Sequence, residues 1–443
     1  MSIRLEPRSE TAGLPARSVA LGLLSITLDR RRPFEDALEV NSIRPRLDAL
    51  EERDRGYALA LARTTLRRLG QIDALLAELI DKPLPARAGP AMHILRIGAA
   101  DLLFLETSPH AAVNSAVELA SADPAAQHFR GLVNAVLRRL SERTDAVRAA
   151  DPTATLLPAW LTEGWARAYG EARTAAIIGA HITEPALDLT LKPGLDANAW
   201  AARLGARVLP SGTLRLGRHP RVPELAGFEE GAWWVQDAAA ALPARLLGDV
   251  RGQRVLDLCA APGGKTATLA ALGGRVTAVD KSPERLARLK DNLARLRLEV
   301  EIVEADARDY TADTPFDAVL LDAPCTATGT IRRHPDLPWI KEPDDIRALS
   351  QLQSEIVERA FGFVAPGGRL VYSVCSLEPE EGEEVIERFL ARTQDAARAP
   401  IGADEIPGAE PFVSAAGDLR TTPADWPEWG GIDGFFAARI VRR

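Results

Sequence analysis

The sequence predicts two kinds of fold in one chain: an all-α region at the N-terminus and an α/β domain with a mostly parallel sheet at the C-terminus. Two patterns carry this prediction. Up to about residue 142, apolar residues recur at helical spacing. From residue 253 onward, short apolar strands alternate with amphipathic helices, which is typical of βαβ units around a parallel sheet.

The composition is that of a globular chain, and its 443 residues predict two or three domains. No uncharged apolar run approaches the length of a membrane span, and the apolar run at residues 18–28 is followed by no small-residue cleavage site, so we expect neither a membrane partner nor a secretory signal. The three cysteines have no metal-ligand spacing, so we expect no metal site and no disulfide framework, but a protein of the reducing cytoplasm. The net charge of −8 does not exclude a nucleic-acid partner, because local basic faces decide phosphate contact.

The N-terminal helices carry the first resemblance. Helical periodicity predicts helices over 19–28, 57–69, 72–79, 92–105, 113–120 and 132–140. The stretches 94–105, 112–120 and 131–138 resemble the NusB family of RNA-binding helical domains. The resemblance implies a NusB-like helical bundle over residues 14–145, with Arg130 and Arg138, which lie off the apolar face, as candidate RNA contacts. From the residues alone, these arginines could equally belong to a solvated surface.

A small α+β subdomain is predicted between the two larger regions, over residues 157–230. A helical stretch follows Pro158, and the alternation of Leu187 to Lys192 is typical of a strand. It could bind substrate or serve only as a scaffold. The third predicted domain covers residues 231–443.

A strand, a tight turn and a helix at residues 255–272 form the centre of the predicted α/β domain. The turn lacks the G-x-G-x-x-G pattern of a dinucleotide site, and Cys259 stands where a phosphate-binding loop needs glycine. The stretch D-L-C-A-A-P-G-G-K-T instead resembles the cofactor motif of 5-methylcytosine RNA methyltransferases. The resemblance implies a Rossmann-like class I domain that binds S-adenosylmethionine. It also implies that residues 157–230 form an RNA-recognition-like subdomain that helps to bind the substrate. The cofactor-binding residues implied in this turn are Cys259, Ala260, Ala261, Pro262, Gly263, Gly264 and Lys265.

Acidic residues follow the next strands of the predicted sheet. Because the carboxyl ends of parallel strands share one edge, we expect Asp280, Asp306 and Asp322 to lie near one another. Asp280 is placed to accept hydrogen bonds from ribose hydroxyls and Asp306 from an adenine amino group. Asp322 is expected both to line the cofactor site and to share a proton with ring nitrogen 3 of a cytosine.

Two cysteines lie at the same predicted edge, Cys325 after Pro324 and Cys375 at the end of the fifth strand. A thiolate can add to carbon 6 of cytosine and make carbon 5 nucleophilic, and it is also a good leaving group. The resemblance to the RNA enzymes implies that Cys375 is the nucleophile and that Cys325 assists product release. DNA cytosine methyltransferases use the cysteine of the Pro-Cys pair, so the opposite assignment stays open. Val374 stands where the RNA family usually has threonine.

The loop after Cys325 contains Arg332 and Arg333, which we expect to contact RNA phosphates around the target base. A helical NusB-like domain followed by this catalytic domain resembles the bacterial 16S ribosomal RNA cytosine-5 methyltransferases. The resemblance implies that the partner is RNA, either 16S rRNA or a small-subunit assembly intermediate, and we expect the protein to act as a monomer. A tRNA cytosine-5 methyltransferase and a catalytically inactive RNA-binding assembly factor are the alternatives.

Overall fold

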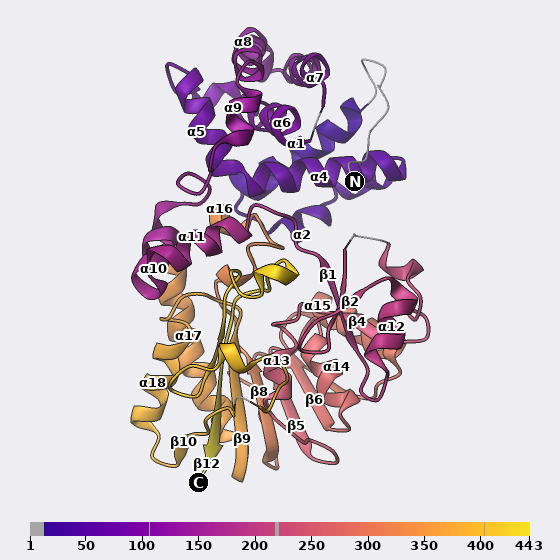
Figure 1. Cartoon of the computed structure of the whole chain (residues 1–443), viewed down its shortest axis with the longest axis vertical. Helices are drawn as coiled ribbons and strands as arrows, with labels where there is room; N and C mark the ends of the chain where they lie inside the picture. The colour runs from indigo at the N-terminus through magenta and orange to yellow at the C-terminus, as the bar shows by residue number, and fades with distance from the viewer. Residues whose placement is uncertain (1–12, 106, 218–220, 403) are drawn as a thin grey trace. The chain divides into compact units, whose positions relative to one another are not determined.

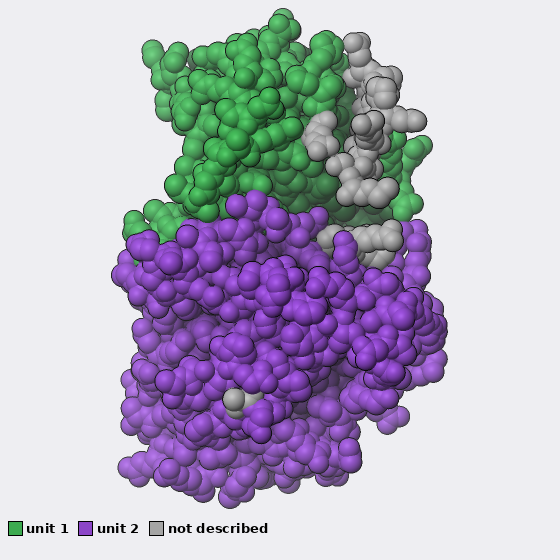
Figure 2. Space-filling model, in the orientation of Figure 1, with its two compact units in different colours: residues 1–163, 334–342 green, residues 164–333, 343–443 purple. Residues whose placement is uncertain are grey.

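The computed structural model describes residues 13–105, 107–217, 221–402 and 404–443. The chain forms two compact units, which Figure 1 shows as ribbons and Figure 2 in two colours. Unit 1 contains residues 1–163 and 334–342, and unit 2 contains residues 164–333 and 343–443. The small α+β region therefore groups with the C-terminal sheet, and a short segment of the C-terminal half groups with the helices. That residues 14–145, 157–230 and 231–443 are three separate domains stays a prediction.

Unit 1 is helical, as the periodicity predicts. Its elements are α1 (Leu14–Asp29), α2 (Phe34–Leu38), α3 (Arg44–Asp48), α4 (Glu52–Arg67), α5 (Leu69–Leu79), η1 (Ala86–Ala88), α6 (Ala91–Phe104), α7 (Pro109–Ala122), η2 (Ala126–Phe129), α8 (Arg130–Ser141), α9 (Thr144–Ala149), the start of α10 (Ala159–Tyr169) and α16 (Leu337–Ile340). The short helices α2, α3 and α9 are absent from the prediction because one or two turns are too short for a periodic pattern to emerge.

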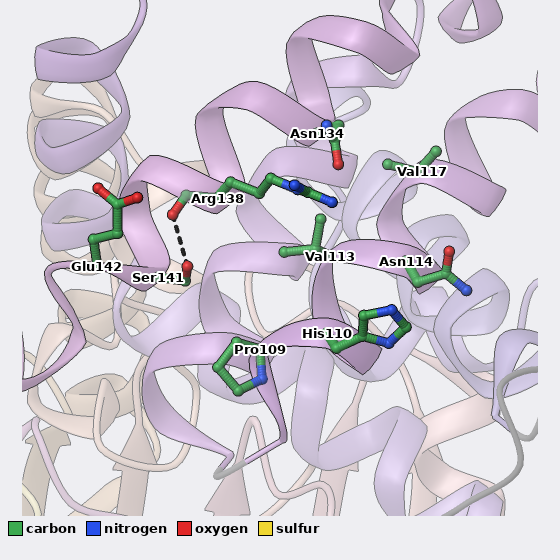
Figure 3. A pocket seen from close by; sticks show the side chains of 9 residues that line it. All are labelled: Pro109, His110, Val113, Asn114, Val117, Asn134, Arg138, Ser141 and Glu142. Atoms are coloured by element: carbon green, nitrogen blue, oxygen red, sulfur yellow. Dashed lines mark hydrogen bonds between the residues drawn. The ribbon is translucent and has the colours of Figure 1, made fainter.

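A pocket of about 360 Å³ lies beside α7 and α8 (Figure 3). Its floor includes Val113 and Val117, and its polar lining includes His110, Asn134 and Arg138. In Figure 3 the Arg138 side chain extends toward Asn134 and Val113. The unit therefore carries a surface hollow that combines apolar, amide and cationic groups.

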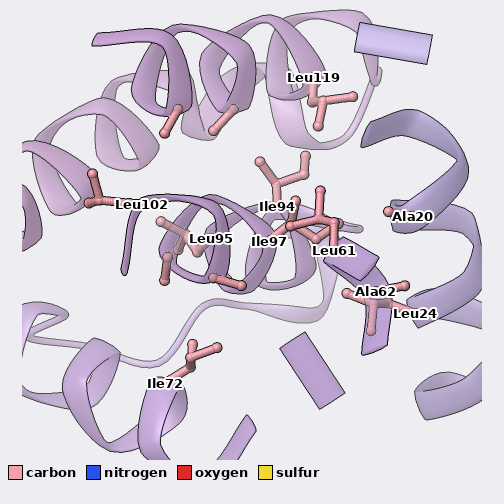
Figure 4. Close-up of a cluster of buried hydrophobic side chains, with 14 of the residues drawn as sticks. Ala20, Leu24, Leu61, Ala62, Ile72, Ile94, Leu95, Ile97, Leu102 and Leu119 are labelled. Atoms are coloured by element: carbon pink, nitrogen blue, oxygen red, sulfur yellow. The ribbon is translucent and has the colours of Figure 1, made fainter. Parts of the chain in front are cut away.

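Helix α6 is at the centre of unit 1 and packs against α1, α4, α7 and α8 (Figure 4). At Gly98 a β-carbon would lie 2.5 Å from a methyl carbon of Leu137 on α8, so a larger residue there would require the Leu137 side chain to move. Asp101 on the same helix is buried and accepts two hydrogen bonds from Arg17, at 2.9 and 2.6 Å. A buried carboxylate needs such partners, because an unpaired charge in the core is strongly destabilising.

The segment 334–342 is held in unit 1 by both polar and apolar contacts. The Trp339 ring packs against the helical core, and its Nε1 donates to the Leu66 carbonyl oxygen at 3.0 Å. The Asp336 carboxylate accepts from the Phe34 backbone N–H at 3.0 Å. The chain directly after Arg333 is thus part of the helical unit.

Unit 2 contains two sheets. The smaller sheet is antiparallel with strand order β2-β3-β1-β4. The larger sheet has the order β10-β12-β9-β8-β5-β6-β7, and β11 pairs with β12. Its strands β9, β8, β5, β6 and β7 are parallel. At one side β12 pairs antiparallel with β9, and β10 pairs antiparallel with β12.

The strands of unit 2 are β1 (Leu187–Leu191), β2 (Arg207–Val208), β3 (Leu214–Leu216), β4 (Trp233–Val235), β5 (Arg254–Leu258), β6 (Arg275–Asp280), β7 (Glu301–Glu304), β8 (Phe316–Asp322), β9 (Val364–Val374), β10 (Ala396–Arg398), β11 (Leu419–Thr421) and β12 (Phe435–Arg442). Its helices are the remainder of α10, α11 (Glu171–Ala180), α12 (Ala197–Leu204), α13 (Leu242–Arg245), α14 (Gly264–Ala271), α15 (Pro283–Leu296), α17 (Pro343–Gly362) and α18 (Glu383–Arg392), with the 3₁₀ turns η3 (Val222–Glu224), η4 (Thr328–Thr330), η5 (Glu410–Phe412) and η6 (Pro427–Trp429).

Both faces of the larger sheet are covered, as expected for a mostly parallel sheet. Val255 belongs to the core on one face and Leu256 to the core on the other, because successive side chains of a strand point to opposite faces. From the central strand β5, the chain order runs to β6 and β7 on one side and continues with β8 and β9 on the other. Such a reversal opens a crevice at the carboxyl ends of the strands. The predicted fold class, a helical domain followed by a Rossmann-like domain, is confirmed.

Candidate active site

The turn between β5 and α14 brings the backbone close to the crevice. Cys259 has a φ of 60° and Gly263 a φ of 101°, so the chain reverses within a few residues. At Gly263 a β-carbon would lie 3.0 Å from the Leu289 side chain of α15. Glycine therefore meets two demands at this position, a left-handed backbone and a close helix contact.

A cavity of about 210 Å³ opens beside this turn at the carboxyl ends of the parallel strands. The sequence-predicted site residues that line it are Cys259, Asp280, Asp306, Asp322, Cys325 and Cys375. The structure thus brings together side chains that lie at or just after the ends of five different strands, β5 to β9, at one edge. The other predicted cofactor residues, from Ala260 to Lys265, lie in the adjoining turn and the start of α14.

Asp280 and Asp306 are held in different ways. The Asp280 carboxylate accepts from the backbone N–H groups of Ala261 and Ser282, at 3.1 and 3.0 Å, so it also fixes the turn. Asp306 accepts two hydrogen bonds from the Arg308 guanidinium, at 3.0 and 2.9 Å. These bonds lower the pKa of Asp306 to about 2, and its carboxylate is therefore ionised at physiological pH.

Asp322 at the end of β8 is paired with a lysine. Lys265 Nζ lies 2.7 Å from one carboxylate oxygen, and Ser373 Oγ donates to the other at 3.1 Å. Lys265 is itself almost buried. Lys265, predicted to bind the cofactor, is in this structure the ion-pair partner of Asp322.

The thiols of Cys325 and Cys375 meet, with their Sγ atoms 3.5 Å apart. The hydrogen bond with Cys375 and burial raise the pKa of the Cys325 thiol well above its usual value. Burial and the nearby carboxylates raise the pKa of Cys259 to about 12, so this third thiol stays protonated. Of the three cysteines, Cys325 and Cys375 are the pair suited to joint thiol chemistry, because their sulfurs are in contact and both line the cavity.

The position of Arg332 conflicts with its expected RNA contact, whereas Arg333 is exposed. Arg332 is only 2% exposed, and its guanidinium lies 3.6 Å from carboxylate oxygens of both Asp237 and Asp433. Arg333 is less buried but donates from Nε to Asp433 at 2.6 Å. In the sequence these two arginines look like a basic loop because their acidic partners lie far away along the chain.

Two polar residues beside the cysteines escaped the sequence analysis. Glu381 is fully buried, and its carboxylate accepts from the backbone N–H of Thr326 at 2.9 Å and from the hydroxyl of the same residue. Gln353 on α17 donates both to Glu381, at 3.0 Å, and to the Pro324 carbonyl, at 2.8 Å. The backbone on both sides of Cys325 is thus fixed by one buried carboxylate and one amide. Glu381 lies in an acidic run that looks like solvated surface, and no local signal distinguishes it.

The candidate RNA contacts of unit 1 are both exposed on α8. Arg138 lines the pocket beside α7, whereas Arg130 lies at the first turn of the helix and outside the pocket lining. Within the described part of the chain, no group of three or more metal-ligating side chains is found, and no helix has the length and apolar character needed to cross a bilayer.

The fold together with the sequence relatives defines the class of protein, an RNA methyltransferase with a Rossmann-like catalytic domain. Residues 244–441 match the model of the 16S rRNA methyltransferase RsmB/F family, and residues 14–142 match the NusB family. The chain is 35% identical over 419 residues to Ribosomal RNA small subunit methyltransferase B of Klebsiella pneumoniae, covering 91% of this chain and 94% of that protein. The protein of the same name from Escherichia coli O1:K1 gives the same identity and coverage. The chain belongs to the RsmB/F family of methyltransferases.

Solved structures agree with this assignment. The crystal structure of PH0851 matches 99% of this chain and all of its own, with a TM-score of 0.73 and 26% identity. A methyltransferase homolog protein from Pyrococcus horikoshii matches 65% of this chain and all of its own, with a TM-score of 0.53 and 27% identity.

Proposed function

We propose that the protein methylates carbon 5 of a cytosine in 16S rRNA, with S-adenosylmethionine as the methyl donor and a covalent bond between Cys375 and carbon 6 of the base. The observation that carries this proposal is the pair of thiols 3.5 Å apart beside three carboxylates in one cavity. Binding RNA alone needs no thiols. Methyl transfer to a nitrogen or an oxygen needs none either, because these atoms are already nucleophilic, so the thiol pair favours transfer to carbon.

The residues of the cavity fit S-adenosylmethionine. Asp280 and Asp306 are carboxylates at successive strand ends, suited to accept from ribose hydroxyls and from an adenine amino group. The turn of small residues from Ala260 to Gly264 lets backbone atoms approach the ligand. When bound, this cofactor supplies an electrophilic methyl group.

The chain's own groups would act on the base in three ways. The Cys375 thiolate adds to carbon 6, which makes carbon 5 nucleophilic. Asp322, with Lys265 as its partner, would exchange a proton with ring nitrogen 3 and so offset the charge that develops as the thiolate adds. Once carbon 5 carries the methyl group, its proton leaves to a base and the bond between sulfur and carbon 6 breaks. Cys325, whose sulfur is adjacent, would assist this release.

The helical unit would supply RNA binding. Arg130 and Arg138 are exposed cations on α8, and the pocket beside Arg138 also offers amide and imidazole groups that can hydrogen-bond to a nucleotide. The family assignment of residues 14–142 and the name of the curated relatives support an rRNA substrate over tRNA. The rRNA methyltransferase relatives support a reaction in the cytoplasm. A single copy of the chain would suffice, because Asp322, Cys325 and Cys375 line one cavity of one chain.

The test uses the full chain, labelled S-adenosylmethionine and three RNA substrates: bare 16S rRNA, small-subunit assembly intermediates and tRNA. We expect labelled 5-methylcytosine in the ribosomal substrates. Cys375→Ala should abolish transfer while cofactor binding survives, and Cys325→Ala should accumulate a covalent protein–RNA adduct. If Cys325→Ala is inactive without an adduct, the two roles are exchanged. Transfer to tRNA alone would refute the rRNA assignment.

A further inference from the structure

We propose that Cys325 and Cys375 are also a modification site, which a hydroperoxide converts to a reversible disulfide that switches the enzyme off. The two sulfurs are in contact at 3.5 Å, and both line the same cavity. A disulfide bond is about 2.05 Å long, so bond formation asks for a sulfur movement of roughly 1.5 Å. The switching effect rests on the proposed function, whereas the thiol chemistry itself does not.

The backbone holds both cysteines in this arrangement. The Cys375 carbonyl oxygen accepts from the Gly329 N–H at 3.0 Å, so the loop that follows Cys325 is tied to the end of β9. The Thr326 N–H is bound by the buried Glu381 carboxylate, which fixes the other thiol. The two sulfurs therefore stay close without a ligand to bring them together.

The surrounding charges make the two sulfurs unequal. Cys325 keeps its proton, because its hydrogen bond to Cys375 and its burial raise its pKa well above the usual value. Burial alone would lower the pKa of the Arg333 guanidinium. The carboxylates of Asp433 and Asp237 and the Cys375 sulfur raise this pKa by more, so Arg333 stays positively charged. The Arg333 cation thus interacts electrostatically with the Cys375 sulfur. Cys375 is therefore the sulfur that attacks an oxidant, and Cys325 is the one that resolves the product.

The reaction balances with one hydroperoxide as the oxidant. The Cys375 thiolate attacks one peroxide oxygen, so that a sulfur–oxygen bond forms, the oxygen–oxygen bond breaks, and hydroxide (or an alkoxide) leaves. The product is a sulfenic acid. Cys325 then loses its proton, its sulfur attacks that of Cys375, a sulfur–sulfur bond forms, and the sulfenic oxygen leaves as water. Two thiols are oxidised by two electrons and the peroxide is reduced.

The disulfide would remove the nucleophile and the release group in one step. It would also protect Cys375, because a sulfenic acid without a neighbouring thiol proceeds to irreversible acids. In a reducing compartment such a bond is transient, and thiol reductants return the enzyme to its active form.

The test treats the reduced full-length chain with hydrogen peroxide in the absence of RNA. We expect two of the three thiols to be lost, the intact mass to fall by two hydrogen atoms, and a cross-linked peptide pair containing residues 325 and 375. Dithiothreitol should restore both the thiols and, measured separately, methyl transfer. If the disulfide forms but the untreated chain methylates no RNA, the proposed function fails and the modification site stands.

Two variants separate a thiol pair from general oxidation. In Cys325→Ser, Cys375 has no thiol partner, so it should gain oxygen atoms that dithiothreitol does not remove. In Cys375→Ser, Cys325 should stay reduced at the same peroxide concentration. The proposal is overturned if the wild-type chain keeps three thiols under conditions that oxidise Cys375 in Cys325→Ser, or if the cross-link contains Cys259.

Discussion

Replacing Arg332 with methionine tests whether this arginine supports the fold or contacts RNA. Its guanidinium is buried between Asp237 and Asp433, at 3.6 Å from each, and donates to the Gly430 carbonyl at 2.7 Å. Methionine keeps an unbranched side chain out to the position of Nε but removes the guanidinium and its charge. Asp433 retains Arg333 as a partner, whereas the buried Asp237 loses a cation 3.6 Å from its carboxylate.

The structure sets the size of the effect. Removing one partner of a buried ion pair costs about 3–5 kcal/mol, because the remaining charge stays buried without compensation. For a protein of this size class, 1 kcal/mol shifts the melting temperature by about 2–4 °C. We therefore expect the melting temperature of unit 2 to fall by roughly 10 °C in Arg332→Met.

Calorimetry of the full chain measures this shift. The transition of unit 2 is identified as the one that added S-adenosylmethionine moves upward, since a ligand stabilises the unit that binds it. Arg130→Met is the matched control, because Arg130 is exposed on α8. The control should leave both transitions within about 1 kcal/mol of wild type, and it should weaken RNA binding and reduce the salt dependence of binding by about one charge.

The reasoning is refuted by the opposite pattern. If Arg332→Met melts like the wild-type chain and instead lowers RNA affinity with a smaller salt slope, then Arg332 reaches the RNA, and its buried position is not the one that functions.

Three further predictions concern carboxylates of unit 2. Asp306→Ala should weaken binding of S-adenosylmethionine by about 10- to 100-fold in titration calorimetry, because a hydrogen bond to a charged group is worth about 1.5–3 kcal/mol; unchanged affinity would place the adenine elsewhere. Glu381→Gln should lengthen the life of the covalent RNA adduct on denaturing gels. In the glutamine amide one carboxylate oxygen is replaced by nitrogen, so the side chain cannot accept both bonds from Thr326, and the neighbouring release group Cys325 is held less firmly. An adduct lifetime equal to wild type would contradict this. Burial raises the pKa of Glu378 to about 7, against the opposing hydrogen bond from Trp165, so the folded state binds more protons than the unfolded state. The wild-type chain should therefore lose stability as pH rises from about 4.5 through 7, and Glu378→Gln should lose less over that window in denaturant titrations at pH 5 and 8.

The local parts of the site were predictable from the sequence. The turn from Cys259 to Lys265 is specified by small residues and by the strand and helix on either side of it, all within one short stretch. The acids and thiols at the strand ends were predictable because a parallel sheet gathers the carboxyl ends of its strands at one edge. The gathering of Asp280, Asp306, Asp322, Cys325 and Cys375 in one cavity follows from these rules.

Distant partners decided the rest. Arg332 and Glu381 have the side chains of surface residues, and only the folded chain brings Asp237 and Asp433 to the arginine and Thr326 and Gln353 to the glutamate. Residues 334–342 likewise group with the helical unit because Trp339 packs against its core. The carbonyl of Leu66, to which Trp339 donates, lies 273 residues earlier in the chain. Periodicity and strand-end rules describe neighbours along the chain. Whether a charge is buried depends on which opposite charge the tertiary fold places beside it, and that cannot be inferred from a single stretch of residues.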